Sequence, residues 1–238
     1  NPGAWAGHGQ AGPQGQQGPD QWQGGGMPPV GSGGAYGQVY GRQTKGVLPD
    51  GAVLAELPEV CVRVSCNQDL LLTHVPAAKR AFVDATLAAH GVRPAGAISL
   101  FRRQAFGCPA LPTCGLAMTE AERAVPGLCE AVEAEGLGDV DVVTRIAGCP
   151  NHCSRPPSAE IGVTGFGKNA HMIAVGGSRE GTRIAHVLYE KISSEQMVPV
   201  LIGLLRAIKH ENPERLPAGE FLHRTSPERL RALVGVEV

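Results

Sequence analysis

The chain has 238 residues, 42% of them hydrophobic, so it can form one large domain or two small ones around a real core. Its formal net charge of −1 gives no bias toward nucleic acid or an anionic membrane. No apolar run approaches the ~20 residues that cross a bilayer, and no secretory signal is visible. We therefore expect a cytoplasmic protein, or a protein of the plastid stroma in a photosynthetic eukaryote, without nucleic-acid or membrane partners.

Residues 1–46 form a first segment dominated by glycine, glutamine and proline. The segment holds almost no charge and no periodic pattern of apolar residues. Such a composition cannot bury enough surface to offset the entropy that is lost on ordering. We expect this segment to be disordered, with ordered structure beginning near Val47.

A strand–helix unit is expected over residues 47–100. Residues 60–65 and 69–75 are short β-branched and apolar runs around a tight connection, which is typical of two paired strands. Residues 76–91 carry apolar residues at helical spacing, including Phe82, so a helix should follow the second strand.

Strands and helices alternate over residues 101–238 without a regular βαβ repeat, which favours the α+β class. Thr119 and Glu122 form a capping-box pattern that predicts a helix start there, with Pro126 disturbing its early turns. The other expected elements are strands at 139–148, 159–167 and 171–177, a helix over 195–210 capped by Ser193 and Gln196, and a last helix over 226–234.

Cysteine is the residue type that carries chemistry in this chain. Seven cysteines are too few for a disulfide scaffold of this size, and their odd number favours a reducing compartment. Four of them form two pairs, with five residues between Cys108 and Cys114 and three between Cys149 and Cys153. Proline follows the first cysteine of each pair. The remaining three, interpreted as buried hydrophobes or bystander thiols, are Cys61, Cys66 and Cys129.

Four thiolates in two separated pairs can hold either a zinc ion or an iron–sulfur cluster. A five-residue gap is wide for a zinc knuckle, whereas a cluster is larger than one ion and tolerates wider and uneven spacing. Soft thiolates suit both metals, so the spacing favours iron–sulfur and leaves a structural zinc site open. His152 lies between two better ligands and is expected to face solvent or to support them. Residues 165–170 read as a hairpin turn, since no helix follows them as it would a phosphate loop.

Two stretches, GCPALPTCGLAMTEAER (107–123) and RIAGCPNHCSRPPSAEIGVTG (145–165), resemble the sulfite and nitrite reductase hemoproteins that use sirohaem and a [4Fe–4S] cluster. The likeness continues through most of residues 47–238, about the second half of that family's chain. It implies a ferredoxin-like strand–helix unit over 47–100. It also implies an iron–sulfur and sirohaem domain over 101–238, built on a mixed sheet with flanking helices.

The same resemblance implies a role for each motif residue. Sulfite would be reduced by six electrons to sulfide, with electrons arriving from a ferredoxin or a flavoprotein. Cys153 would be both a cluster ligand and the catalytic bridge to the sirohaem iron, while Asn151 and Arg155 would contact the cofactors. The full set of implied cluster ligands is Cys108, Cys114, Cys149 and Cys153.

The chain also departs from the family pattern. His152 replaces the family's usual small residue before the last cysteine. The family binds the sirohaem carboxylates and sulfite mainly with residues from its first half, which has no counterpart here. Three interpretations stay open: the chain is a fragment, it comes from an incomplete gene model, or it is one subunit of a split enzyme whose partner is a separate N-terminal half. Basic residues that could pair with the carboxylates are Arg145, Arg155, Lys168, Arg179 and Arg183. The sequence of residues 107–123 resembles the assimilatory sulfite-reducing branch of the family more closely than its nitrite-reducing branch. A nitrite reductase, or a cluster-only electron-transfer fragment without sirohaem, is the alternative.

Overall fold

The computed structural model describes residues 36–40, 56–64 and 70–236. Cys66 and most of the segment expected to be disordered lie outside these residues. Within that segment the structure does place strand β1, Tyr36–Tyr40, which pairs antiparallel with β3.

The first sheet has three antiparallel strands in the order β1–β3–β2. Strands β2, Cys61–Val64, and β3, Leu70–Val75, lie where the apolar runs predicted them. A 3-10 turn, η1 at Ala77–Lys79, leads into helix α2, Arg80–Ala89, and a second turn, η2, follows at Ala95–Ala97. The core of this unit consists of Leu57, Val60, Leu72, Val75, Val83, Leu87 and Val92.

Helix α2 buries a different face from the one predicted. Val83 and Leu87, four residues apart, are its buried side chains, whereas Phe82 is 39% exposed. Residues at i and i+4 share one face of a helix, so burying Val83 with Leu87 turns Phe82 toward solvent.

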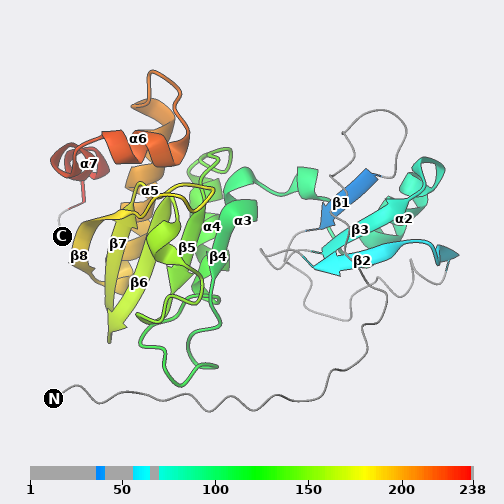
Figure 1. Ribbon diagram of the computed structural model, residues 1–238, viewed down its shortest axis with the longest axis horizontal. Coiled ribbons are helices and arrows are strands. Elements are labelled where there is room, and N and C mark those ends of the chain that lie inside the picture. The colour runs from blue at the N-terminus through cyan, green and yellow to red at the C-terminus, as the bar shows by residue number, and fades with distance from the viewer. Residues whose placement is uncertain (1–35, 41–55, 65–69, 237–238) are drawn as a thin grey trace, which may run out of the picture. The chain divides into compact units, whose positions relative to one another are not determined.

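The second sheet has five strands in the order β4–β5–β6–β7–β8 (Figure 1). Strands β4, β5 and β6 are parallel to one another, whereas β7 is antiparallel to both β6 and β8. The expected mixed sheet is therefore confirmed. The strands are β4 at Ala105–Gly107, β5 at Thr144–Ala147, β6 at Ile161–Gly167, β7 at Ala170–Val175 and β8 at His186–Ile192.

Helices flank this sheet, as expected. Helix α5 runs along one face of the sheet in Figure 1 and contacts α4, α6, α7 and strand β7. Ile146, Val163 and Ile173 share this face and are fully buried with Leu201 and Leu204 of α5. The helical elements are α3 at Leu100–Gln104, α4 at Ala124–Ala134, η3 at Pro156–Ser158, α5 at Ser194–His210, α6 at Ala218–Arg224 and α7 at Pro227–Val234. Among the described residues, none of the helices has the length and apolar character needed to cross a membrane.

Two predicted helix starts are confirmed and one is wrong. Ser193 and Gln196 form the full capping box of α5, and Ser226 caps α7. Helix α4 begins only at Ala124, because the backbone N–H groups of Thr119 and Glu122 donate to the cysteine loops instead. Pro126 therefore falls in the first turn of α4, where its missing N–H costs no intrahelical hydrogen bond.

Candidate metal centre

The two cysteine pairs leave the sheet at the same edge. Strands β4 and β5 are neighbours and parallel, with Gly107 opposite Ile146, so their carboxyl ends meet. Cys108 directly follows β4, and its N–H donates to the carbonyl of Ile146 at 3.0 Å. Cys149 follows β5 after a single residue. The sheet topology thus brings together two motifs that are far apart in sequence, at the lower end of the sheet in Figure 1.

The first cysteine loop, residues 108–122, is held against the start of the second at Gly148. The carbonyl of Gly148 accepts hydrogen bonds from the N–H groups of Met118 at 2.8 Å and Thr119 at 3.1 Å. The N–H of Gly148 donates to Cys108 Sγ at 3.3 Å. Glu122 closes the loop by donating its N–H to the carbonyl of Cys108 at 3.0 Å. Gly148 therefore joins the two cysteine loops through both of its backbone groups.

A side chain at position 148 would not fit between the loops. A Cβ atom there would lie 2.6 Å from the Cβ of Ala110 and 2.7 Å from the carbonyl oxygen of Thr119. Real Cβ contacts are longer than this, so the close approach of the loops requires glycine.

The second cysteine loop is a sequence of tight turns tied back to strand β5. His152 donates its N–H to the carbonyl of Cys149 at 3.3 Å, and Arg155 donates to the carbonyl of His152 at 2.7 Å. The buried hydroxyl of Ser154 donates to the carbonyl of Ile146 at 2.7 Å. These bonds fix the path of the backbone on both sides of Cys153.

Both loops contain residues in the left-handed backbone region. Ala110, His152 and Arg155 have φ values of 47°, 54° and 59°. This region is uncommon for residues other than glycine, and such strain concentrates at functional sites in proteins.

The four paired thiols differ in exposure. Cys108 and Cys149 are each 7% exposed, Cys114 is half-buried and Cys153 is exposed. Neither these four cysteines nor Cys61 and Cys129 form a disulfide. Within the described part of the chain, no three His, Cys, Asp or Glu side chains converge as ligands of a single metal ion. The backbone brings the thiol-bearing loops together, and the assignment of all four as ligands stays a prediction.

The donor set nevertheless fits a thiolate-bound cluster. Its sulfur atoms are free, and one of them already accepts an N–H hydrogen bond, the kind of contact that tunes iron–sulfur centres. Cys129, by contrast, lies within helix α4 and is fully buried in the core, which agrees with its interpretation as a small hydrophobe.

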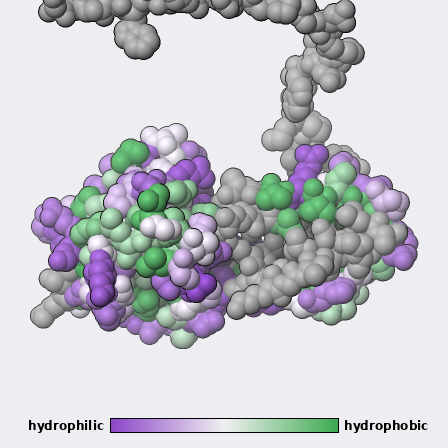
Figure 2. Space-filling view, turned by 90° about the horizontal axis from the view of Figure 1, so that it is seen from below, coloured by the Kyte–Doolittle hydropathy of each residue, from purple (hydrophilic) through white to green (hydrophobic). Residues whose placement is uncertain are grey.

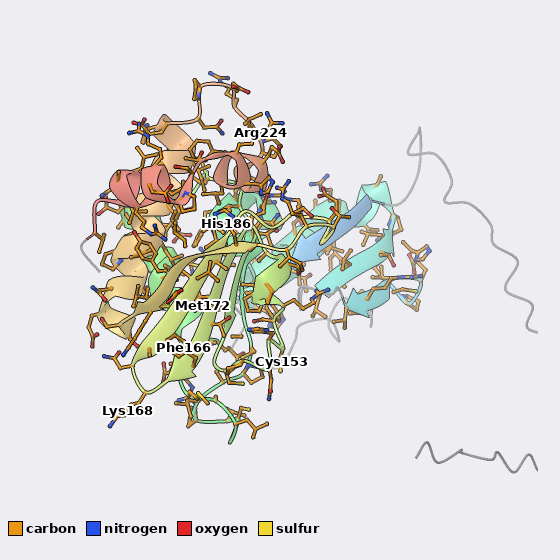
Figure 3. All side chains as sticks on the ribbon, turned by 60° about the vertical axis from the view of Figure 1, so that its left-hand side comes forward. Cys153, Phe166, Lys168, Met172, His186 and Arg224 are labelled. Atoms are coloured by element: carbon orange, nitrogen blue, oxygen red, sulfur yellow. The ribbon has the colours of Figure 1, made fainter. Side chains whose placement is uncertain are left out.

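Two residues expected to support the cofactors are exposed on the second loop. Asn151 and Arg155 both face solvent, and the described residues offer no hydrogen-bond or ion-pair partner to either side chain. Lys168 lies on the β6–β7 turn at the same edge as Cys153, as Figure 3 shows. Their cofactor roles remain predictions.

Apolar side chains surround this edge. Leu116 and Met118, from the first cysteine loop, and Phe166, from the end of β6, are exposed. Figure 2 views the molecule from this side and shows hydrophobic side chains interspersed with hydrophilic ones.

The other three candidate cations make contacts within the protein. Arg145 donates to the carbonyl of Gln104 at 3.2 Å and stacks over the ring of Phe106, 5.2 Å from its centroid. Arg179 forms an ion pair with Asp141 at 2.8 Å, and this pairing raises the pKa of the guanidinium.

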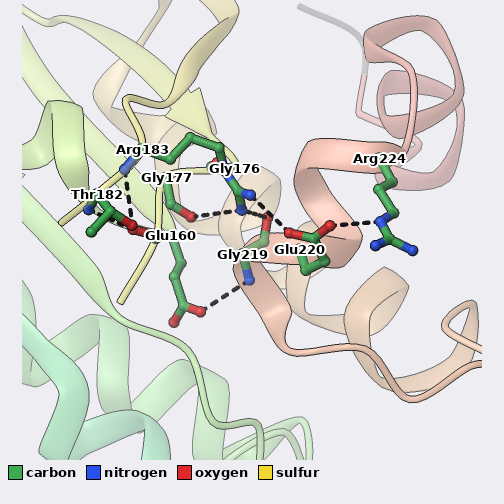
Figure 4. Close-up of polar contacts among 9 residues, drawn as sticks. Glu160, Gly176, Gly177, Thr182, Arg183, Gly219, Glu220 and Arg224 are labelled. Atoms are coloured by element: carbon green, nitrogen blue, oxygen red, sulfur yellow. Dashed lines mark hydrogen bonds and ion pairs between the residues drawn. The ribbon is translucent and has the colours of Figure 1, made fainter. Parts of the chain in front are cut away.

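Arg183 holds the loop after β7 against helix α6 (Figure 4). Its guanidinium donates to the carbonyls of Gly176 at 2.7 Å and Gly219 at 3.0 Å and pairs with Glu220 at 2.7 Å. The bond from Arg183 is the main reason that the pKa of Glu220 is lowered. Arg183 therefore stabilises the fold through several contacts at once, which composition and spacing could not indicate.

A buried carboxylate that sequence analysis missed completes this network. Glu160, 3% exposed, accepts hydrogen bonds from the N–H groups of Val143 at 2.7 Å and Gly219 at 3.0 Å. Arg179 reaches the same carboxylate at 3.4 Å. Glu160 lies just before β6, so it anchors the end of the segment that carries Cys149 and Cys153.

Comparison with known proteins shows which proteins this chain and its fold resemble. No family model matches the chain. It is 38% identical over 200 residues to the "Sulfite reductase [NADPH] hemoprotein beta-component" of Xanthomonas oryzae pv. oryzae, covering 79% of this chain and 34% of the relative. It is 37% identical over 169 residues to the "Sulfite reductase [ferredoxin]" of Synechococcus elongatus, covering 69% of this chain and 27% of the relative.

Two solved structures share the fold. The NirA protein of Mycobacterium tuberculosis aligns with a TM-score of 0.64 at 23% identity, over 83% of this chain and 39% of that one. Dissimilatory sulfite reductase I aligns with a TM-score of 0.65 at 11% identity, over 84% of this chain and 69% of that one.

The chain is thus a homologue of the redox hemoproteins with this mixed sheet. Its relatives are named sulfite reductases, so the resemblance to the sulfite and nitrite reductase family that the cysteine motifs indicated is confirmed. It spans about a third of the length of the curated relatives that it matches.

Proposed function

We propose that this chain is the cluster-binding part of a sulfite reductase hemoprotein. The observation that carries the proposal is the arrangement at one sheet edge, where Cys108 and Cys149 follow adjacent parallel strands and Gly148 bonds both loops. Sulfite is preferred over nitrite because the relatives from Xanthomonas oryzae pv. oryzae and Synechococcus elongatus, 38% and 37% identical, are named sulfite reductases.

In this proposal the four thiolates of Cys108, Cys114, Cys149 and Cys153 would hold a [4Fe–4S] cluster, and Cys153 would also link that cluster to a sirohaem. These groups would supply electron storage and the six-electron reduction of sulfite to sulfide. The chain's own contribution is positional. Strands β4 and β5 set the separation of the loops, the N–H of Gly148 stabilises charge on the Cys108 sulfur, and Ser154 fixes the backbone next to Cys153.

The domain boundaries and partners are part of the same proposal. A strand–helix unit over 47–100 precedes a cluster and sirohaem domain over 101–238. The first half of the family's chain, in cis or in trans, supplies most of the cations for the sirohaem carboxylates and sulfite, since Arg145, Arg179 and Arg183 make contacts within the protein. The electron donor is a flavoprotein or a ferredoxin, the two types that the names of the relatives indicate.

Iron and sulfide content after anaerobic purification test the cluster assignment. We expect four irons per chain, a marked loss of iron in Cys108→Ser, and no loss in the matched control Cys129→Ser, whose thiol lies in the core. Full iron content in Cys108→Ser would show that the first pair does not bind the cluster, and stoichiometric zinc without iron would identify a zinc domain.

Sirohaem and turnover are tested on the chain combined with the N-terminal half of a relative. A Soret band and sulfite-dependent oxidation of reduced viologen are expected, and Cys153→Ser should abolish the turnover. Cluster absorbance without haem bands would identify a cluster-only electron carrier. Turnover that survives in Cys153→Ser would assign the bridge to another residue.

A further inference from the structure

His152 turns inward between two exposed neighbours. Its Nε2 atom is buried and has no hydrogen-bond partner among the described residues. Asn151 and Cys153, on either side, are both exposed. Buried polar atoms in proteins are nearly always hydrogen-bonded, so an orphaned ring nitrogen indicates a partner that the chain itself does not supply.

The backbone fixes the direction in which this side chain leaves the loop. His152 has a φ of 54°, in the left-handed region that only a few per cent of residues other than glycine adopt, with histidine, asparagine and aspartate over-represented among them. Its N–H is bonded to the carbonyl of Cys149, and its carbonyl accepts from Arg155. Both peptide groups of the residue are therefore held, and the imidazole is presented by a constrained turn rather than by a free loop.

Sulfur is the acceptor that this position offers. His152 is flanked within three residues by the thiols of Cys149 and Cys153, and a thiolate or sulfide sulfur accepts N–H hydrogen bonds. We infer that His152 Nε2–H donates a hydrogen bond to a sulfur atom of the centre bound by these cysteines, and that it raises the reduction potential of that centre. The reason is that reduction adds negative charge to the sulfur atoms, which an N–H donor stabilises. The inference rests on the proposed function and makes His152 a positioning residue, not a ligand.

Two variants with the same backbone strain separate the hydrogen bond from packing. His152→Gln keeps an N–H donor of similar reach, whereas His152→Leu fills similar space without one. On the full 238-residue chain with its cluster, we expect the midpoint potential to fall in His152→Leu and to stay near the wild-type value in His152→Gln. The reduced cluster should also lose one exchangeable-proton coupling in His152→Leu when examined by electron–nuclear double resonance after exchange into D2O.

A third variant keeps the test decisive if leucine disturbs folding. His152→Gly removes the donor and suits the left-handed backbone, so it should fold at least as well as the wild type and show the same fall in potential. Unchanged potentials in His152→Leu and His152→Gly, or an equal fall in His152→Gln, would overturn the inference while leaving the proposed function intact. A wild-type chain that takes up no cluster under reconstitution with iron and sulfide would refute the proposed function, and this inference with it.

Discussion

Glu160 is predicted to be the side chain whose loss most weakens the segment that carries Cys149 and Cys153. Its carboxylate is buried and accepts two backbone hydrogen bonds, from Val143 at the approach to β5 and from Gly219 in α6. Glu160→Leu has a similar volume but removes both acceptors. The change therefore leaves two buried N–H groups without partners.

The magnitude follows from those two groups. A buried donor left unsatisfied costs about 1–3 kcal/mol, so two of them should lower the free energy of unfolding by roughly 3 kcal/mol. Arg179 adds little to this loss, because it keeps its bond to Asp141 at 2.8 Å. Glu160→Gln retains one carbonyl oxygen and should cost about half as much. For a domain of this size, roughly 3 kcal/mol corresponds to about 6–12 °C in the melting temperature.

Scanning calorimetry of the purified chain measures this effect. The matched control is Glu180→Leu, since Glu180 is exposed in the same loop as Arg179 and should change stability little. The order of melting temperatures should be wild type, then Glu160→Gln, then Glu160→Leu. If Glu160→Leu melted within a degree of the control, the two N–H groups would have other partners and the anchoring role would be refuted.

Three further changes test other parts of the fold. Gly148→Ala should lower the free energy of unfolding by about 1–3 kcal/mol in denaturant titrations, because the added Cβ has no space. Gly127→Ala in helix α4 should raise it by about 0.5–1 kcal/mol, because a Cβ added there meets nothing within 4 Å. Equal effects of the two changes would contradict the packing argument. The bond from Arg102 lowers the pKa of Glu133 from its ordinary 4.5 to about 2, so the pair stabilises the fold above pH 4.5 and this contribution is lost as the pH falls toward 2. Because Glu133 is one-third exposed, Glu133→Gln should cost only about 1 kcal/mol near neutral pH, and this cost should shrink as the pH falls through about 2 in acid-unfolding curves. A pH-independent loss would refute the ion-pair account. Ser193→Ala, which removes the cap of α5, should cost about 1 kcal/mol in thermal unfolding, and an unchanged melting temperature would show that the box contributes nothing.

The elements that could be predicted from sequence are those determined by neighbouring residues. The alternation of residues 159–177 predicted the hairpin of β6 and β7, because strand periodicity and a turn are local properties. The same holds for the cap formed by Ser193 and Gln196, whose two reciprocal hydrogen bonds span only three residues.

The errors arise where long-range contacts decide. Thr119 and Glu122 match a capping box, yet their N–H groups bond to Gly148 and Cys108, so the helix starts later. Strand β4 has three residues, which is too short for any periodicity to show, although it positions the first cysteine. The spacing of the cysteines predicted a metal-binding motif. The direction of the His152 ring could not be predicted, because it depends on a left-handed backbone that composition does not encode.

The parallel pairing of β4 with β5 also determines when the two cysteine loops can meet during folding. Cys108 Sγ and the N–H that it accepts are 40 residues apart in the chain, and α4 must be laid down between them. Such non-local pairings form late in folding, after local hairpins such as β6–β7. The two cysteine loops therefore come together only when β4 pairs with β5. If the four thiols bind one cluster, as proposed, that cluster can be bound completely only after this part of the sheet has closed.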